Sequence, residues 1–185
     1  MAQTWRVTQK THKKPRPPLV EASLERLALH YVERYATTRA KLGAYLLRKI
    51  AERGWAGAAA DPVPPLVERF AALNYVDDRA FASARAASLT RRGYGVRRVG
   101  QALRAAGVEE ADAEPAREEA REGAWEAALR FAQKRRIGPY AAQPPSDRAA
   151  REKGIAAMLR AGHGLDHARR IINACPGEIP ELDGY

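Results

Sequence analysis

Residues 74–108 read NYVDDRAFASARAASLTRRGYGVRRVGQALRAAGV, and the organisation of the chain can be worked outward from this stretch. It opens on two aspartates, Asp77 and Asp78, after which no acidic residue appears until Glu109. Aspartate is a preferred N-cap, and a second carboxylate in the first turn interacts favourably with the positive end of the helix dipole. The pair therefore predicts the start of a helix.

Arginine accumulates where the acids are missing. Gly93 and Gly95 enclose Tyr94 between two helical patterns, which predicts two short helices joined by a tight turn. The arginines lie on both helices and in the turn: Arg79, Arg85, Arg91, Arg92, Arg97, Arg98 and Arg104. Because a solvated helix face usually mixes charges of both signs, this segregation favours a binding surface.

The rest of the chain repeats the scheme. An apolar residue followed four positions later by glycine recurs as Ile50 to Gly54, Leu103 to Gly107 and Met158 to Gly162, at intervals of 53 and 55 residues. Glycine just past the last turn commonly ends a helix, and a period of this length is typical of helical arrays. No segment alternates apolar and polar residues as a strand does. The sequence therefore predicts an all-α fold of tandem three-helix units.

This scheme divides the chain into five parts. They are a disordered basic arm over 1–22, three-helix repeats over 23–76, 77–122 and 123–175, and a loose C-terminal tail over 176–185. Ser23 and Thr38 are expected to begin helices, and Leu73 is expected to be buried. A glutamate-rich helix with an alanine inner face is expected between Asp112 and Glu122.

Composition narrows the class of protein. The 185 residues carry a formal net charge of +10 and a pI near 10.1, which fits either a polyanionic partner or ordinary solubilising charge. The single cysteine, Cys175, excludes an intrachain disulfide and fits a reducing cytosol. No apolar run approaches membrane-spanning length, and the N-terminus lacks the hydrophobic segment of a signal peptide. We expect a soluble, cytoplasmic protein that does not contact membranes.

Motifs for catalysis are missing from the sequence. His163 and His167 lie four residues apart, but two histidines at a helix end without a third ligand are more often solvated than metal-bound. The Asp77 and Asp78 pair is more often a cap than a catalytic dyad. Phosphate-binding glycine loops and nucleophile elbows are also missing. We therefore expect no enzyme activity, no cofactor and no metal.

The candidate partner-binding residues centre on the helix after Gly95. Arg97, Gln101 and Arg104 are spaced by one helical turn each and form a stripe clear of the apolar face, with Arg98 beside it. The turn adds Arg91, Arg92 and Tyr94, the preceding helix adds Arg85, and a second cluster of Lys134, Arg135 and Arg136 extends the same surface.

The order of these motifs resembles the RecX family of bacterial recombination regulators. The resemblance is carried by Tyr75-Val76-Asp77-Asp78, Phe81-Ala82, Arg92-Gly93-Tyr94-Gly95, Arg97-Arg98, and Leu103 with Gly107-Val108. It extends more weakly from Ser23 to Ala174. Two departures are Val76 in place of the usual leucine, and the segment from Arg85 to Leu89, where the family often carries an aromatic residue and further arginines.

This resemblance implies an elongated, curved, basic monomer that binds the filament of the RecA recombinase. It implies inhibition of RecA's ATP hydrolysis, strand exchange and co-protease activity, and hence negative regulation of recombination and of the SOS response. Single- or double-stranded DNA is a second candidate ligand.

Two other functions remain open on the residues alone. One is a DNA-binding helix-turn-helix in which Gly93-Tyr94-Gly95 is the turn and the segment from Val96 to Ala106 enters a groove. The other is a helical adaptor for a different acidic protein.

Overall fold

The protein is a row of helices. A computed structural model describes residues 16–181, and over that range it holds nine α-helices, one short 3-10 helix and no strand, which confirms the all-α prediction. The helices are α1 (Glu21–Arg34), α2 (Arg39–Arg53), α3 (Val63–Ala72), α4 (Asp78–Arg91), α5 (Val96–Ala105), α6 (Glu110–Glu122), α7 (Ala124–Arg135), α8 (Arg148–Arg160) and α9 (Leu165–Ile172), with η1 at Gly138–Tyr140.

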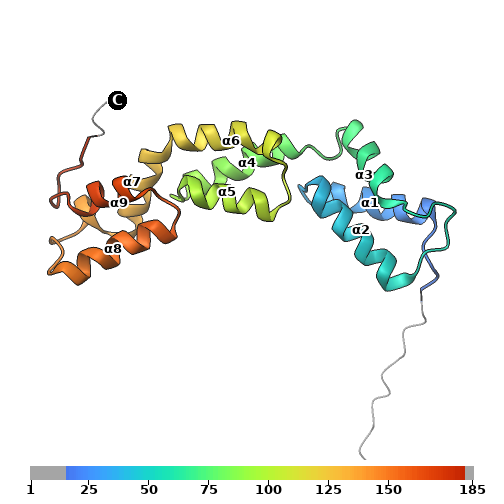
Figure 1. Ribbon diagram of the computed structural model, residues 1–185, viewed down its shortest axis with the longest axis horizontal. Helices are drawn as coiled ribbons and strands as arrows, with labels where there is room; N and C mark the ends of the chain where they lie inside the picture. Colours follow the sequence, from blue (N-terminus) through green and yellow to red (C-terminus); the bar gives the residue numbers. More distant parts are fainter. Residues whose placement is uncertain (1–15, 182–185) are drawn as a thin grey trace, which may run out of the picture.

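The helices form three units that follow one another along an elongated, bent molecule (Figure 1). We call α1–α3 the first unit, α4–α6 the second and α7–α9 the third. Each has its own apolar cluster, centred on Leu42, Leu46 and Phe70 in the first unit. Alanines pack around Val99 and Leu103 in the second, and Met158 and Ile171 lie at the centre of the third. The tandem three-helix architecture is therefore confirmed.

Local capping explains several helix boundaries. The side chains of Thr38 and Asp77 accept hydrogen bonds from the amides of Lys41 and Ala80, at 3.2 and 2.8 Å, and so cap α2 and α4. The three glycines of the repeat, Gly54, Gly107 and Gly162, have φ of 82°, 71° and 94° and follow α2, α5 and α8. This left-handed conformation favours glycine, which accounts for its recurrence.

The N-terminal boundary differs from the expectation. Helix α1 begins at Glu21, and Ser23 is not its N-cap but lies inside its first turn, where its hydroxyl binds Val20. The expected disordered arm ended at residue 22, whereas Leu19 is fully buried in the first unit's core. Leu19 also exchanges backbone hydrogen bonds of 2.9 and 2.8 Å with Gly54 and Ala56. Residues 1–15 of the arm lie outside the described residues.

Two further predictions needed correction. Leu73, expected in the core, is 58% exposed because α3 ends at Ala72 and the chain turns outward toward Asn74. The glutamate-rich helix begins at Glu110 rather than near Asp112. Its inner face is alanine as expected, with Ala113, Ala116 and Ala120 buried.

The units are joined by the same geometry at two places. At the first joint, between the first and second units, the Thr38 hydroxyl at the start of α2 donates to the carbonyl of Ala106, 2.6 Å away. At the second joint, at the start of α5, the amides of Gly95 and Arg97 donate to the carbonyls of Ala161 and Gly162, at 3.0 and 3.1 Å. In each case carbonyls in the turn that ends the second helix of one unit accept hydrogen bonds from the start of the second helix of the preceding unit.

Candidate binding groove on the second unit

A basic groove of about 700 Å³ runs between α4 and α5. Four cationic side chains and one amide line it, and none of the described residues that line it is acidic. We call it the α4–α5 groove. Its polar lining is Lys41, Arg85, Arg92, Arg98 and Gln101, and its apolar lining is Ala36, Phe81, Leu89, Tyr94, Ala102, Ala105 and Ala106.

The helix periodicity explains why these side chains face the groove. Helix α5 buries Val99 and Leu103, so that Arg98 and Gln101 emerge on the side that faces α4. Helix α4 buries Ala82, Ala86 and Leu89 and leaves Arg85 exposed. The groove therefore combines these polar side chains with an apolar lining.

Aromatic rings hold two of the cations in place. The Lys41 ammonium lies 4.9 Å from the centre of the Phe81 ring, and the Arg92 guanidinium lies 5.4 Å from the centre of the Tyr94 ring. Such cation–π contacts restrict long side chains while leaving their hydrogen-bond donors free. The groove therefore offers pre-positioned donors for carboxylate or phosphate oxygens.

The structure divides the predicted arginine stripe. Of its members, Gln101 lines the α4–α5 groove with the flanking Arg98, but Arg97 lies beside a smaller depression at the second joint. Arg104 lies over Gly100, on the side of α5 toward Arg117 of α6. These residues thus border different neighbours on α5, and a shared role for them in partner binding stays a prediction.

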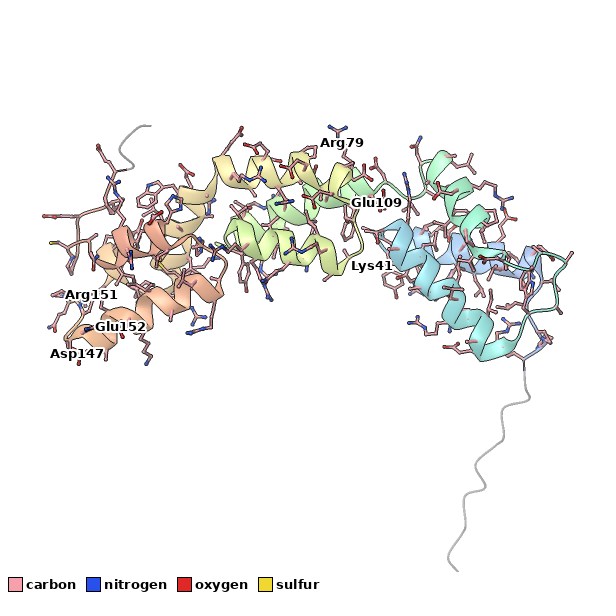
Figure 2. The ribbon with its side chains drawn as sticks, viewed as in Figure 1. Lys41, Arg79, Glu109, Asp147, Arg151 and Glu152 are labelled. Carbon is pink, nitrogen blue, oxygen red and sulfur yellow. The ribbon has the colours of Figure 1, made fainter. Side chains whose placement is uncertain are left out.

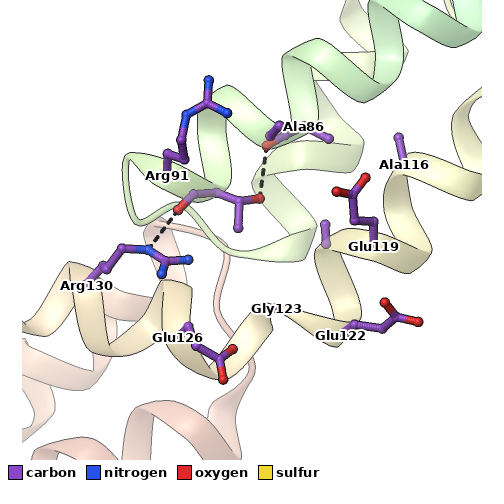
Figure 3. A pocket seen from close by; sticks show the side chains of 11 residues that line it. Ala86, Arg91, Ala116, Glu119, Glu122, Gly123, Glu126 and Arg130 are labelled. Atoms are coloured by element: carbon purple, nitrogen blue, oxygen red, sulfur yellow. Dashed lines mark hydrogen bonds between the residues drawn. The ribbon is translucent and has the colours of Figure 1, made fainter.

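Arg91 belongs to another surface. It lines a concave region of about 740 Å³ among α4, α6 and α7, on which Glu119, Glu122 and Glu126 are also found (Figure 3). There the Arg130 guanidinium donates to the carbonyl of Thr90, 3.4 Å away. Because this surface mixes acids and bases, Arg91 does not belong with the arginines of the α4–α5 groove.

The Gly93-Tyr94-Gly95 turn is a packing element. Gly93 and Gly95 are buried, and a side chain on Gly95 would overlap the backbone of Gly162. Tyr94 packs against the apolar clusters of both the second and the third units. The N-terminal end of α5 is thus covered by the third unit, which disfavours its insertion into a DNA groove as a recognition helix.

The second basic cluster lies next to the groove. Lys134 donates to the carbonyl of Arg92, 3.0 Å away, and so adds a cation at the groove's edge. The Arg135 guanidinium lies 5.7 Å from the centre of the Phe131 ring, and Arg136 follows α7 with a φ of 54°. A role for these three residues in binding stays a prediction.

Lys41 was missed in the sequence. It comes from the first unit and reaches the groove across the first joint, where Figure 2 shows it between the first and second units. Its spacing within α2 marks it only as an exposed residue. The repeat does not mark it either, since the interval of 53 residues places Lys41 at the position of Tyr94 and not at that of one of the groove's arginines.

The histidine pair has separate roles. His163 is buried, and its Nε2 lies 3.1 Å from the carbonyl of Gly93, to which it donates. Burial lowers the pKa of the His163 imidazole, which keeps the ring neutral. The ring of His167 packs edge-on against Trp125. Within residues 16–181 no group of three potential metal ligands comes together.

These features define a helical-repeat protein with a cationic groove in which no described lining residue is acidic. Comparison with known proteins gives the family. A family model described as "RecX, second three-helix domain" matches residues 77–116, which contain the groove's two helices. A curated protein from Myxococcus xanthus (strain DK1622), "Regulatory protein RecX", is 34% identical over 160 residues, which cover 83% of this chain and 86% of that protein. The chain belongs to the RecX family of regulatory proteins, as the motifs predicted.

Solved structures show the same fold. A crystal structure of RecX from Lactobacillus salivarius is similar, with a TM-score of 0.65 at 19% identity, over 82% of this chain and 94% of that one. A second crystal structure, titled as regulatory protein RecX, has a TM-score of 0.65 at 22% identity, over 82% of this chain and 72% of that one. In the described part of the chain, no helix is both long and apolar enough to span a bilayer.

Proposed function

We propose that this protein binds the RecA filament through the α4–α5 groove and negatively regulates recombination and the SOS response. It does so by inhibiting RecA's ATP hydrolysis, strand exchange and co-protease activity, as a cytoplasmic, non-enzymatic monomer. The observation that carries the proposal is the groove itself, which is lined by cations from two units and by no described acidic residue. Family membership supports the choice of partner.

The α4–α5 groove suits a partner that is built from repeated subunits. Arginine forks bind carboxylates or phosphates in two-point geometry, and both groups are exposed on a protein filament assembled on DNA. Units that are strung along an elongated molecule can contact successive subunits at once, so that modest individual contacts sum to a useful affinity. Bridged subunits would be restrained from the movements that accompany ATP turnover.

The test replaces the groove's arginines together. A variant with Arg85→Ala, Arg92→Ala and Arg98→Ala should require at least about tenfold more protein for half-maximal inhibition of RecA ATPase, since charge-assisted contacts contribute roughly 1.5–3 kcal/mol each. The matched control removes three exposed arginines elsewhere, Arg26, Arg151 and Arg160. It has the same net charge and should inhibit as the wild type does.

Circular dichroism must show equal helicity in both variants. Equal inhibition by the groove variant and the wild type would contradict the assignment of the groove. DNA binding without RecA, lost in the groove variant and retained in the control, would show instead that DNA phosphates are the groove's ligand.

A further inference from the structure

The first and second units share fewer contacts with each other than the second and third units do. In the described part of the chain, the helices of the first unit make at most sparse contacts with those of the second, whereas α7 of the third unit packs on both α4 and α6. At the second joint, backbone hydrogen bonds and the buried Gly93, Gly95 and Gly162 hold the units together. Fewer contacts therefore fix the angle between the first and second units.

Two buried polar side chains hold the first joint. Thr38 is 0% exposed and donates to the carbonyl of Ala106, 2.6 Å away. Asp78 is 3% exposed, and its Oδ1 accepts from the backbone amide of Arg39, 2.8 Å away. Asp78 therefore caps α2, a helix of the neighbouring unit, while the exposed Asp77 caps α4, its own helix.

The closed joint is an unfavourable place for a carboxylate unless that carboxylate is hydrogen-bonded. Burial raises the pKa of the Asp78 carboxyl, against the opposing effects of the Arg39 amide and guanidinium. A buried acceptor that loses its donor must be solvated again or stay unsatisfied. In the closed joint the Arg39 amide takes the place of water at Asp78, and loss of the Asp78 acceptor would leave this first amide of α2 without its side-chain partner.

The α4–α5 groove is completed across this joint. Lys41 and Ala36 belong to the first unit, and all the other lining residues belong to the second. Lys41 lies less than one helical turn beyond Thr38 and Arg39, so the same contacts that fix the start of α2 place its ammonium over the Phe81 ring. The angle between the units therefore decides whether the groove has its complete set of cations.

We infer that Thr38 and Asp78 are positioning residues for partner binding, which lock the first unit onto the second and thereby complete the α4–α5 groove. This inference rests on the proposed function of the groove. A partner that spans the groove binds the closed arrangement, and its apparent dissociation constant rises as the closed fraction falls. If the closed fraction drops to about a tenth, the constant rises about tenfold.

The angle across the joint can be measured directly. The free, exposed Cys175 labels the region after α9, and Leu47→Cys, at a position that is 56% exposed, labels the first unit. Energy transfer between dyes on these two sites should give one narrow distance distribution in the otherwise unchanged full-length protein. Asp78→Ala and Thr38→Val should each broaden it, with helicity by circular dichroism unchanged. Both should need about tenfold more protein to inhibit RecA.

Two control variants distinguish the effect of the Asp78 hydrogen bond from the effect of its negative charge. Asp78→Asn keeps an oxygen that can accept from Arg39 and should behave as the wild type in both measurements. Asp77→Asn removes the same charge from the exposed neighbour and should change neither. An unbroadened distribution in both Asp78→Ala and Thr38→Val would overturn the inference, and so would broadening with unchanged inhibition.

A different result is expected if the α4–α5 groove does not bind RecA. In that case the Arg85, Arg92 and Arg98 variant would inhibit RecA normally and show the narrow wild-type distance distribution. That outcome overturns the proposed function and with it the role of the joint in binding.

Discussion

His163 illustrates how one buried side chain can fix a joint between repeats. Its Nε2 donates to Gly93 of the second unit, and its ring lies 5.4 Å from that of Phe131, centre to centre. Its Nδ1 is buried without a partner. A second proton on this ring would therefore bring an uncompensated charge into an apolar contact. The neutral ring is the form that the second joint requires.

A pH dependence of stability follows. Burial lowers the folded-state pKa of His163. Below about pH 6.5 this imidazole is therefore protonated in the unfolded chain, but it stays neutral in the folded chain until the pH approaches the lower folded-state pKa. The stabilisation is present above that pH and is lost as pH falls toward the folded-state pKa, by up to about 1.4 kcal/mol per pH unit. Urea unfolding at pH 7.5 and 5.5 measures the loss, which should be smaller in His163→Gln. An equal loss in both proteins would contradict this role.

At the scale of the element, helix ends were the most predictable features. Thr38, Asp77 and the three glycines act through the backbone within one turn, so that their spacing alone reveals them. Leu19 was missed because its burial depends on Gly54, 35 residues further along, to which its amide donates. No local pattern distinguishes one leucine after three prolines from part of a disordered arm.

The turn between α8 and α9 can be tested with two neighbouring glycines. Gly162 has a φ of 94°, and a side chain there would overlap the Arg98 backbone, so Gly162→Ala should lower the free energy of unfolding by at least about 1–3 kcal/mol. Gly164 is the N-cap of α9, with a φ of −69° and open space around it, so Gly164→Ala should lower the free energy of unfolding by no more than about 1 kcal/mol, the loss typical when alanine replaces a favoured N-cap residue. Thermal or urea unfolding compares them. Equal effects would show that the turn does not depend on close packing.

At the scale of the whole molecule, the sequence revealed the charge but not its distribution. Arg85, Arg92 and Arg98 were found because the acid-free stretch is continuous in sequence. Arg91 was grouped with them, although the direction of its side chain relative to Glu119 depends on how α6 and α7 pack. Lys41 could not be assigned to the groove, since its place there depends on the first joint. Contacts between units are set by tertiary packing, which helical periodicity does not encode.

The separation of the basic groove from the acid-bearing surface of α6 and α7 predicts how binding responds to salt. If the groove's cations meet fixed negative charges, raising NaCl from about 50 to about 200 mM should weaken inhibition of the RecA filament. The Arg85, Arg92 and Arg98 variant should respond less steeply, because each phosphate contact contributes a slope of about −0.9 in log affinity against log salt on duplex DNA. A slope reduced by about three units would identify phosphates as the groove's ligands. A smaller reduction favours carboxylates of the protein filament, and an unchanged slope would contradict a role for the groove's charge in binding.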